Sequence, residues 1–324
     1  MIITRTPYRI SLFGGGTDYP QWYLKKGGAV VSFSIDKFCY ISLRELPPFF
    51  QHKYRVSYSK IELTKKVEEI THPAVREAIK IFSPELSLEV QHQGDLPASS
   101  GVGSSSAFAV GIIKALTELN SQSLDDKLIA KLAIDFEQNV LNENVGSQDQ
   151  IACALGGLNL IEFGPGKEWK VEPILLTSDA IAEMESSMVL IFSGIARNSS
   201  RISETFVKNI SINHDLLNKS KSLAYECKKL LETERDLVNI GHMLKEAWEL
   251  KQKLNPKSVT PVLLEIFNRA NAAGAIGGKV LGAGGGGFCL FWVNPKNREV
   301  FIENMKPCVH VPFKIMNTGT SRIL

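Results

Sequence analysis

The chain of 324 residues is 44% hydrophobic and 22% charged, and its 37 basic and 34 acidic side chains leave a net charge of only +3. This composition is typical of a folded soluble protein and excludes a disordered chain, a collagen-like fibre and a bundle of membrane helices. The small, evenly scattered charge indicates no nucleic-acid or membrane partner, and the length favours two domains that share a ligand-binding interface.

The cysteines and histidines indicate a reducing compartment and no structural zinc or iron site. No C-x-x-C pair or histidine cluster occurs, so we expect reduced core thiols at Cys39, Cys153, Cys227, Cys289 and Cys308. Any metal should be a hard cation held by oxygen atoms. Because Arg5 and Arg9 interrupt the N-terminal segment, no secretory signal is predicted and a cytoplasmic location is expected.

In the first half of the chain, strands and two helices are predicted around glycine-rich loops. The strands are expected at residues 2–13, 29–46, 54–58 and 86–92, where β-branched and aromatic residues gather. The run SSAFAVGIIKALTEL at 105–119 is apolar on almost every side, which predicts a buried helix. A second helix is expected to begin near Ser123, with an N-cap in the segment S-L-D-D, and to end near Leu141.

The second half mixes strands with longer helical stretches. Strands are predicted at 157–163, 187–193 and 288–293, with further short strands in VPFKI and at the C-terminus, and helices at 201–232, 235–254 and 258–274. A turn at GPGK places the domain boundary near 164–180. We therefore expect an α+β chain with an N-terminal domain at 1–175 and a C-terminal domain at 176–324.

The segment PASSGVGSSSA at 97–107 runs directly into the predicted buried helix. Glycines let the backbone approach a ligand, and a helix N-terminus offers free N–H groups and a positive dipole end, so an anion site is predicted. The segment lacks the lysine of a Walker A loop. The alternative is a flexible turn that only caps the helix.

Glu137 and Asp149 are candidate functional carboxylates. With about 100° per residue, Glu137 falls on the apolar arc of the helix predicted at 123–141, where an ionised carboxylate is costly unless it is paired or metal-bound. It either binds Mg²⁺ or lies at the edge of the arc and reaches water or a lysine. Asp149 either caps the next helix or acts as a general base.

Two further segments are candidates for the same cleft. Five of the six residues at 282–287 are glycines, so the backbone there is expected to approach a ligand or the other domain closely. Arg9 lies in an alternating strand before FGGGTDYP, and it is either a structural ion-pair partner or a fixed cation for phosphate.

Taken together, the motifs resemble those of the GHMP kinases. TPYRISLFGGGTDYP at 6–20 is similar to the first motif of that family, PASSGVGSSSA at 97–107 to the second and VLGAGGGGF at 280–288 to the third. The resemblance implies an N-terminal α/β domain like the second domain of a ribosomal protein and a ferredoxin-like C-terminal domain. ATP and the substrate would bind between them.

The resemblance also implies a role for particular residues. The phosphates of ATP would be bound by Pro97, Ser100, Gly101, Val102, Gly103, Ser104, Ser105 and Ser106. Mg²⁺ would be bound by Ser105 and Glu137. Asp149 would be the catalytic base and Arg9 the cation beside the transferred phosphoryl group. The sugar would be bound by Gly15, Gly16, Thr17, Asp18, Gly284 and Gly285.

The form GGGTDYP resembles the D-glycero-D-manno-heptose 7-phosphate kinases within the family, which phosphorylate the anomeric hydroxyl. The acceptor's own phosphate is then expected near Arg197, with Arg201 or a lysine as alternatives. A kinase for another free sugar such as fucose or galactose, a decarboxylase and a catalytically silent binding protein are the rival functions. A homo-oligomer is left open.

Overall fold

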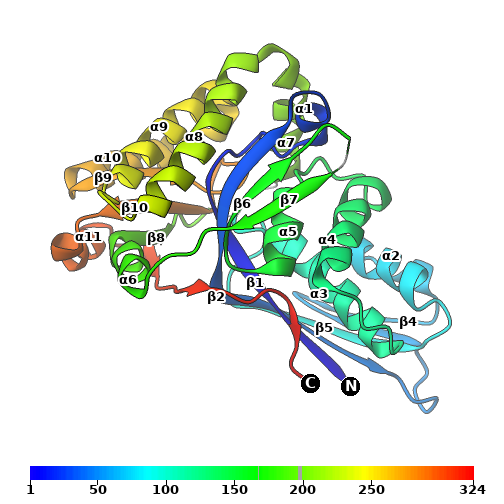
Figure 1. Ribbon diagram of the computed structural model, residues 1–324. Helices are drawn as coiled ribbons and strands as arrows, with labels where there is room; N and C mark the ends of the chain where they lie inside the picture. The colour runs from blue at the N-terminus through cyan, green and yellow to red at the C-terminus, as the bar shows by residue number, and fades with distance from the viewer. Residues whose placement is uncertain (167, 196–198) are drawn as a thin grey trace.

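The computed structural model describes residues 1–166, 168–195 and 199–324, which form two β-sheets and the helices that cover them (Figure 1). In the described residues the larger sheet has nine strands, with the order β13-β1-β2-β5-β3-β4 along its main path and with β12, β6 and β7 joined beside β2. Its strands are β1 (Ile2–Phe13), β2 (Gly28–Glu45), β3 (Tyr54–Ser57), β4 (Ile61–Thr64), β5 (Leu88–Gly94), β6 (Leu158–Phe163), β7 (Trp169–Pro173), β12 (Ile315–Met316) and β13 (Ser321–Arg322).

The long strand β2 organises this sheet because it exchanges partners along its length. Its first residues, Gly28–Phe33, pair with β6, and Cys39–Glu45 pair with β5, while β1 runs antiparallel beside it. The first eight residues of β2 are buried, which fits the apolar run that predicted the strand. The strands predicted at 2–13, 29–46, 54–58 and 86–92 are confirmed.

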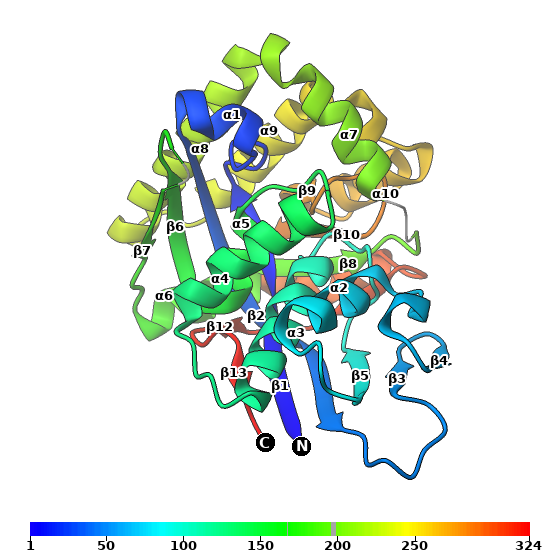
Figure 2. The same ribbon diagram turned by 90° about the vertical axis from the view of Figure 1, so that its right-hand side faces the viewer.

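A group of helices covers one face of the larger sheet (Figure 2). They are α2 (Pro73–Phe82), α3 (Ser104–Leu119), α4 (Asp126–Asp135) and α5 (Gln148–Leu155). Helix α3 contacts both β1 and β2 and is buried over most of its length, as its apolar sequence predicts. The loop at 97–103 leads directly into the N-terminus of this helix.

Helix α4 begins and ends differently from the prediction. Its N-cap is Asp125, whose carboxylate accepts a hydrogen bond of 2.8 Å from the Leu128 N–H, so the helix starts after the expected Ser123. The chain then widens into a π-helical turn at Phe136–Val140. Phe136 and Glu137 are both buried there, which confirms that Glu137 faces inward.

The smaller sheet has the order β11-β8-β10-β9, all antiparallel. Its strands are β8 (Met188–Phe192), β9 (Ala275–Val280), β10 (Phe288–Val293) and β11 (Val309–Val311). The helices of this half are α6 (Ser178–Ser187), α7 (Ser199–Asn209), α8 (His214–Thr233), α9 (Asn239–Leu254), α10 (Pro261–Ala272) and α11 (Arg298–Asn304). Together with the larger sheet they form the expected two-domain α+β fold.

Several boundaries in this half differ from the prediction. The helix expected at 201–232 is divided by a 3₁₀ turn at Ile210–Ile212, where β-branched residues precede Asn213 and helix propensity is low. Helix α10 begins only at Pro261, which occupies the first helical position and disfavours a helical conformation in the residue before it, and the Thr260 hydroxyl accepts a hydrogen bond from the Leu263 N–H as the N-cap. The short helices α1 (Pro20–Lys26), α2, α5, α6 and α11 were not predicted.

The C-terminal tail returns to the larger sheet. Strand β12 pairs with β2, and β13 pairs with β1, so these residues belong with the first half of the chain in space. Strand β7 lies within the expected boundary at 164–180 and extends the larger sheet through β6. The predicted division between 1–175 and 176–324 assigns this tail to the C-terminal domain, whereas its strands pair with the larger sheet.

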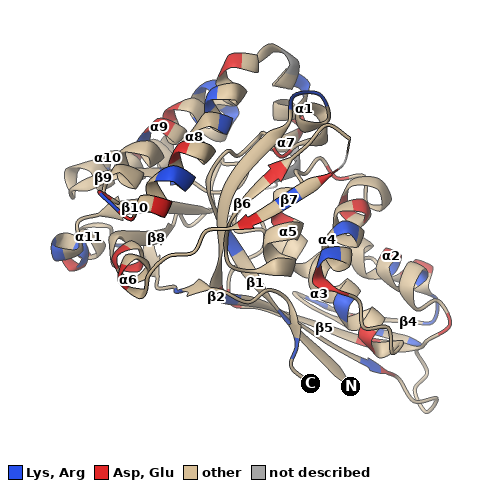
Figure 3. Ribbon diagram, viewed as in Figure 1, with Lys and Arg blue, Asp and Glu red and all other residues tan. Residues whose placement is uncertain are grey.

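The cysteines, the distribution of charge and the polarity of the helices can be compared with what the composition led us to expect. Cys39, Cys153, Cys227 and Cys289 are free and buried, and Cys308 is free and partly exposed. Figure 3 shows acidic and basic residues mixed over the helices. Among the described residues, every helix is too short or too polar to span a bilayer.

Candidate active site

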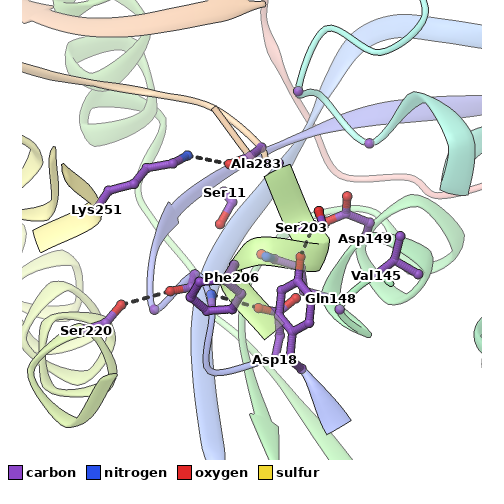
Figure 4. Close-up of a pocket in the computed structure, with 18 of the residues that line it drawn as sticks. Ser11, Asp18, Val145, Gln148, Asp149, Ser203, Phe206, Ser220, Lys251 and Ala283 are labelled. Carbon is purple, nitrogen blue, oxygen red and sulfur yellow. Dashed lines mark hydrogen bonds between the residues drawn. The ribbon is translucent and has the colours of Figure 1, made fainter. Parts of the chain in front are cut away.

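A cavity of about 210 Å³ lies where the end of β1 meets α3, α5 and the helices of the second half (Figure 4). Residues from widely separated parts of the sequence form its wall, including side chains of α7, α8 and α9. Of the residues singled out in the sequence, those that line it are Arg9, Gly15, Gly16, Asp18, Gly101, Gly103, Ser104, Ser105 and Asp149. The structure therefore brings about half of the predicted site residues to one cavity wall, and the predicted metal ligand Glu137 is not among those that line it.

The N-terminus of α3 is open at the cavity wall. Gly103 is its N-cap, with a φ of 76° that favours glycine, and no side chain caps the helix. The first-turn N–H groups lack partners within the helix, and Ser104 and Ser105 line the cavity beside them. This end of α3 is a suitable binding site for a phosphate group.

Other residues of the loop at 97–103 and of the first turn of α3 are buried behind the cavity wall. Val102 is buried, and the buried Ser100 donates a hydrogen bond of 2.6 Å to the Pro97 carbonyl. Ser106 is buried and directs its hydroxyl to Glu137. Of the predicted phosphate-binding residues, Pro97, Ser100, Val102 and Ser106 lie away from the cavity wall.

The two glycine-rich loops contact each other directly. A methyl group on Gly101 would lie 2.6 Å from the Leu281 carbonyl oxygen, and one on Gly282 would lie 2.5 Å from the Gly101 Cα. The Phe288 N–H donates to the Ser100 carbonyl at 2.9 Å. The glycines of the second loop therefore allow the close approach of the two halves of the chain, which was one of the two predicted reasons for them.

Gly284 and Gly285 are displaced from the site that the sequence suggested. Gly284 packs against Ser258, and the Gly285 N–H donates to the Ser258 carbonyl at 2.7 Å. Gly282 and Ala283 line the cavity in their place. The sequence identified the loop but not which of its residues face the ligand, because a run of glycines has no side-chain pattern.

Arg9 and Asp149 form a bidentate ion pair at the cavity wall. The Arg9 Nε donates to Asp149 Oδ1 at 2.6 Å, its Nη2 pairs with Oδ2, and its Nη1 donates to the Gly101 carbonyl at 2.8 Å. Burial alone would lower the pKa of Arg9, but the Asp149 carboxylate outweighs it and the pKa is raised. Asp149 lies in the first turn of α5 and faces Arg9 rather than capping that helix.

Glu137 lies behind the first turn of α3 in the π-helical turn. Its Oε2 accepts hydrogen bonds from the Ser106 hydroxyl at 2.6 Å and from Gln150 Nε2 at 2.5 Å, whereas its buried Oε1 has no hydrogen-bond partner among the described residues. Burial raises the pKa of this carboxyl to about 7. A buried carboxylate with an unsatisfied oxygen suits a cation ligand.

The turn at Gly14–Asp18 closes another side of the cavity. Asp18 is buried and accepts a hydrogen bond of 3.0 Å from the Gly16 N–H, and burial, followed by the charge of Asp149, raises its pKa to about 6. Gly15 has open space where a side chain would be. Thr17 is fully buried and bonded to the carbonyls of Gly14 and Ala29, so it holds the turn and does not line the cavity.

Two lysines that sequence reasoning missed line the same cavity. Lys279 on β9 donates to the carbonyls of Ser11 and Leu12, and Lys251 on α9 donates to those of Val280 and Gly282. Lys251 follows Leu244 and Trp248 at helical spacing, so the periodicity that identified Glu137 would have placed it on a buried face. The predicted Arg197 lies outside the described residues.

The residues fit a magnesium ion only in part. Glu137 offers an unsatisfied oxygen, and Ser105, which is exposed at the cavity wall, offers a hydroxyl. Within residues 1–166, 168–195 and 199–324, no cluster of three acidic, histidine or cysteine residues could hold a metal on its own. A cation here would therefore share its coordination with the oxygens of a bound phosphate and with water.

Comparison with known protein families gives two matches. Residues 66–157 match the family described as GHMP kinases N terminal domain, and residues 224–308 match GHMP kinases C terminal. The first match includes the loop at 97–103 and the carboxylates Glu137 and Asp149. The second includes Lys251, Lys279 and the glycine-rich loop at 282–287.

Individual relatives match over nearly the whole chain. D-glycero-alpha-D-manno-heptose 7-phosphate kinase of Campylobacter jejuni is 30% identical over 316 residues, which cover 94% of this chain and 93% of that protein. A mevalonate kinase of Pyrococcus abyssi is 28% identical and covers 86% of this chain and 76% of its own length.

The solved structure of a D-glycero-D-manno-heptose 1-phosphate kinase from Bacteroides thetaiotaomicron matches with a TM-score of 0.81 and 26% identity. This match covers 100% of this chain and 99% of that one.

Proposed function

The chain belongs to the GHMP kinase family, and from that premise we propose that it transfers the γ-phosphoryl group of ATP to the anomeric hydroxyl of a sugar phosphate. The acceptor proposed is D-glycero-D-manno-heptose 7-phosphate, and the product is the 1,7-bisphosphate, an intermediate for nucleotide-activated heptose. The relative from Campylobacter jejuni, named as a kinase of that sugar phosphate, supports this acceptor.

The observation that carries the proposal is the Arg9–Asp149 pair beside the open end of α3. Asp149 lines the cavity and is joined through Arg9 to the Gly101 carbonyl, and Gly103 and Ser105 line the same cavity. The transfer of a phosphoryl group to a hydroxyl requires a base close to a phosphate-binding site, and this cavity wall offers both.

In the proposed reaction the N–H groups and serines at the start of α3 bind the β- and γ-phosphates of ATP. The acceptor oxygen forms a bond to the γ-phosphorus, the bond to the ADP oxygen breaks, and the hydroxyl proton passes to the Asp149 carboxylate. Arg9 orients that carboxylate through two hydrogen bonds, and its positive charge would lie beside the reacting phosphoryl group.

Ser105 and Glu137 are the residues proposed to hold Mg²⁺, which would neutralise phosphate charge when bound. Asp18, with its buried carboxylate directed by the Gly16 N–H, is proposed to accept hydrogen bonds from sugar hydroxyls. Gly15 and Gly16 leave room for the sugar beside it.

Release of ADP with a panel of sugars and sugar phosphates, with and without Mg²⁺, tests the proposal. We expect turnover with heptose 7-phosphate and a product whose ³¹P spectrum contains a second, anomeric phosphate. Turnover of free fucose or galactose in preference would refute the acceptor but keep the kinase. Carbon dioxide release, or no ADP release with any acceptor, would refute the kinase.

A further inference from the structure

Lys279 is a buried cation that the reaction described above does not use. Its side chain is 7% exposed, and its ammonium donates hydrogen bonds of 3.0 Å to the Ser11 carbonyl and 2.8 Å to the Leu12 carbonyl. No carboxylate pairs with it among the residues that the structure describes. Burial lowers its pKa to about 7, and the charge of Arg9 adds to this effect. A cation in such a place is costly unless an anion arrives to compensate it.

Lys251 brings a second positive charge to the same cavity. Its ammonium donates to the carbonyls of Val280, at 2.9 Å, and of Gly282, and in the described part of the chain it too has no carboxylate partner. Burial, and after it the charge of Lys279, lowers its pKa. Since an ammonium has three donors and each lysine uses two on carbonyls, each keeps one donor for a ligand.

Ser11 completes a set of groups that suits a phosphate. Its hydroxyl is buried, lines the cavity and has no hydrogen-bond partner among the described residues. Its own carbonyl is one of the two that hold Lys279. Two ammonium groups and a free hydroxyl at one wall match the oxygens of a phosphate dianion.

Figure 4 shows where one of these lysines lies relative to the residue proposed as the base. In Figure 4, Lys251 lies on the far side of Ser11 and Ala283 from Asp149. The open end of α3 and the Arg9–Asp149 pair already provide a place for the transferred group. An acceptor that presents its anomeric hydroxyl to Asp149 can therefore extend past the empty space at Gly15 toward the lysines.

We propose that Lys279, Lys251 and Ser11 form a subsite for the phosphate that the acceptor already carries, so that the enzyme selects phosphorylated over free sugars. The inference rests on the proposed function, and it replaces Arg197 by residues of β9, α9 and β1. The subsite gives the second half of the chain a direct part in acceptor recognition.

The test compares kcat/KM for heptose 7-phosphate and for unphosphorylated heptose in three variants. Lys279→Met should lower kcat/KM for the phosphorylated acceptor by about ten- to a hundredfold and that for the free sugar by less than about threefold, with the KM for ATP little changed. Lys251→Met should show the same selectivity with a smaller loss. Lys253→Met, on the exposed side of α9, is the matched control and should behave as wild type.

Two results would overturn the subsite. An equal loss with both acceptors would assign the lysines a structural role, and a raised KM for ATP would place them in the nucleotide site. Should Lys279→Met fail to fold, Ser11→Ala decides, because that hydroxyl has no partner within the described protein to lose. It should lower kcat/KM for the phosphorylated acceptor alone by about three- to tenfold, and no selective loss would refute the proposal.

A binding measurement separates this inference from the proposed function. Inorganic phosphate is titrated into enzyme saturated with a non-hydrolysable ATP analogue and Mg²⁺, so that the γ-phosphate position is filled. Binding by wild type and Lys253→Met, with loss in Lys279→Met, would support the subsite even if wild type turned over no sugar phosphate. Equal binding by all three would contradict it.

Discussion

The two ends of the cavity treat charge in opposite ways. At the end formed by β1 and α5, Arg9 is paired with Asp149 and also bonded to the Gly101 carbonyl. At the end formed by β9 and α9, Lys279 and Lys251 are bonded only to carbonyls and have no carboxylate partner in the described chain. The side-chain charge of Arg9 at the first end is therefore paired without a ligand, whereas the charges of the two lysines at the second end have no carboxylate partner in the described chain.

This difference suggests what each end does. A charge pair that is already satisfied is preorganised, so little rearrangement is needed when a reacting group arrives. Cations without a counter-ion instead increase the attraction for an anionic ligand and distinguish it from a neutral one. This difference supports the proposal that Asp149 takes part in the chemistry and that the lysines select the acceptor.

The largest effect is expected from Asp149→Asn, which removes the proposed base and leaves the Arg9 charge unpaired. We expect kcat to fall by about a thousandfold or more per folded molecule, because general base catalysis typically contributes about 10²–10⁴ and the pair also positions Arg9. Binding of ADP should persist. Asp179→Asn, at an exposed position in the first turn of α6, is the control. Wild-type ADP release by Asp149→Asn would remove chemistry from this end.

Glu137→Gln should produce the next largest effect. The buried carboxylate would lose the charge that makes its free Oε1 a cation ligand, so the Mg²⁺ concentration needed for half-maximal rate should rise by about ten- to a hundredfold. Glu68→Gln, at an exposed position in the 3₁₀ turn at Val67–Glu69, is the control and should shift that value little. An unchanged Mg²⁺ dependence in Glu137→Gln would exclude Glu137 as a ligand.

Asp18→Asn should lower kcat/KM for the acceptor by about tenfold at pH 8. Since the carboxylate form accepts hydrogen bonds and the pKa of Asp18 is raised to about 6, wild-type kcat/KM should increase as pH rises through 6. The variant should lack this contribution to the acid limb. An identical pH profile in both proteins would show that Asp18 does not contact the sugar.

The same raised pKa has a consequence for stability. Relative to the unfolded chain, the protonated Asp18 contributes stability that is fully present below pH 4 and is lost as pH rises through 6. Between pH 4 and pH 7 the free energy of unfolding of wild type should therefore fall by about 2 kcal/mol more than that of Asp18→Asn. Urea unfolding of both proteins at the two pH values measures this difference.

Gly15→Ala should produce the smallest effect. No atom lies within 4 Å of the added methyl group, so the variant should fold normally and raise the KM for the acceptor by only about threefold by narrowing the cavity. Gly16→Ala is the contrast, because its φ of 92° and a contact of 2.8 Å with Phe206 should lower the melting temperature. A fall in melting temperature for Gly15→Ala would contradict the open space described here.

Much of this arrangement is readable from local patterns. The apolar arc placed Glu137 inside, and the helix at 105–119 and the paired strands at 2–13 and 29–46 follow from their hydrophobic periods. Patterns of this kind depend on neighbours a few residues apart, so they identify elements and buried faces.

Other features depend on contacts between distant segments. The pairing of β12 and β13 with the first sheet, and the packing of Gly282 on Gly101, join residues that are far apart in the sequence. The alternatives for Asp149 stayed open for the same reason, because only the fold shows that its carboxylate faces Arg9. Lys279 was overlooked because its carbonyl partners lie on β1, in the other half of the chain.

The most direct test is a crystal structure with Mg²⁺, ADP and heptose 7-phosphate bound. If Asp149 is the base, the anomeric oxygen should lie within about 3 Å of an Asp149 carboxylate oxygen. If Lys279 belongs to the acceptor subsite, the acceptor's phosphate should lie within about 3 Å of the Lys279 ammonium. A complex with that phosphate at the start of α3, or with the anomeric oxygen turned toward Lys251, would contradict these assignments.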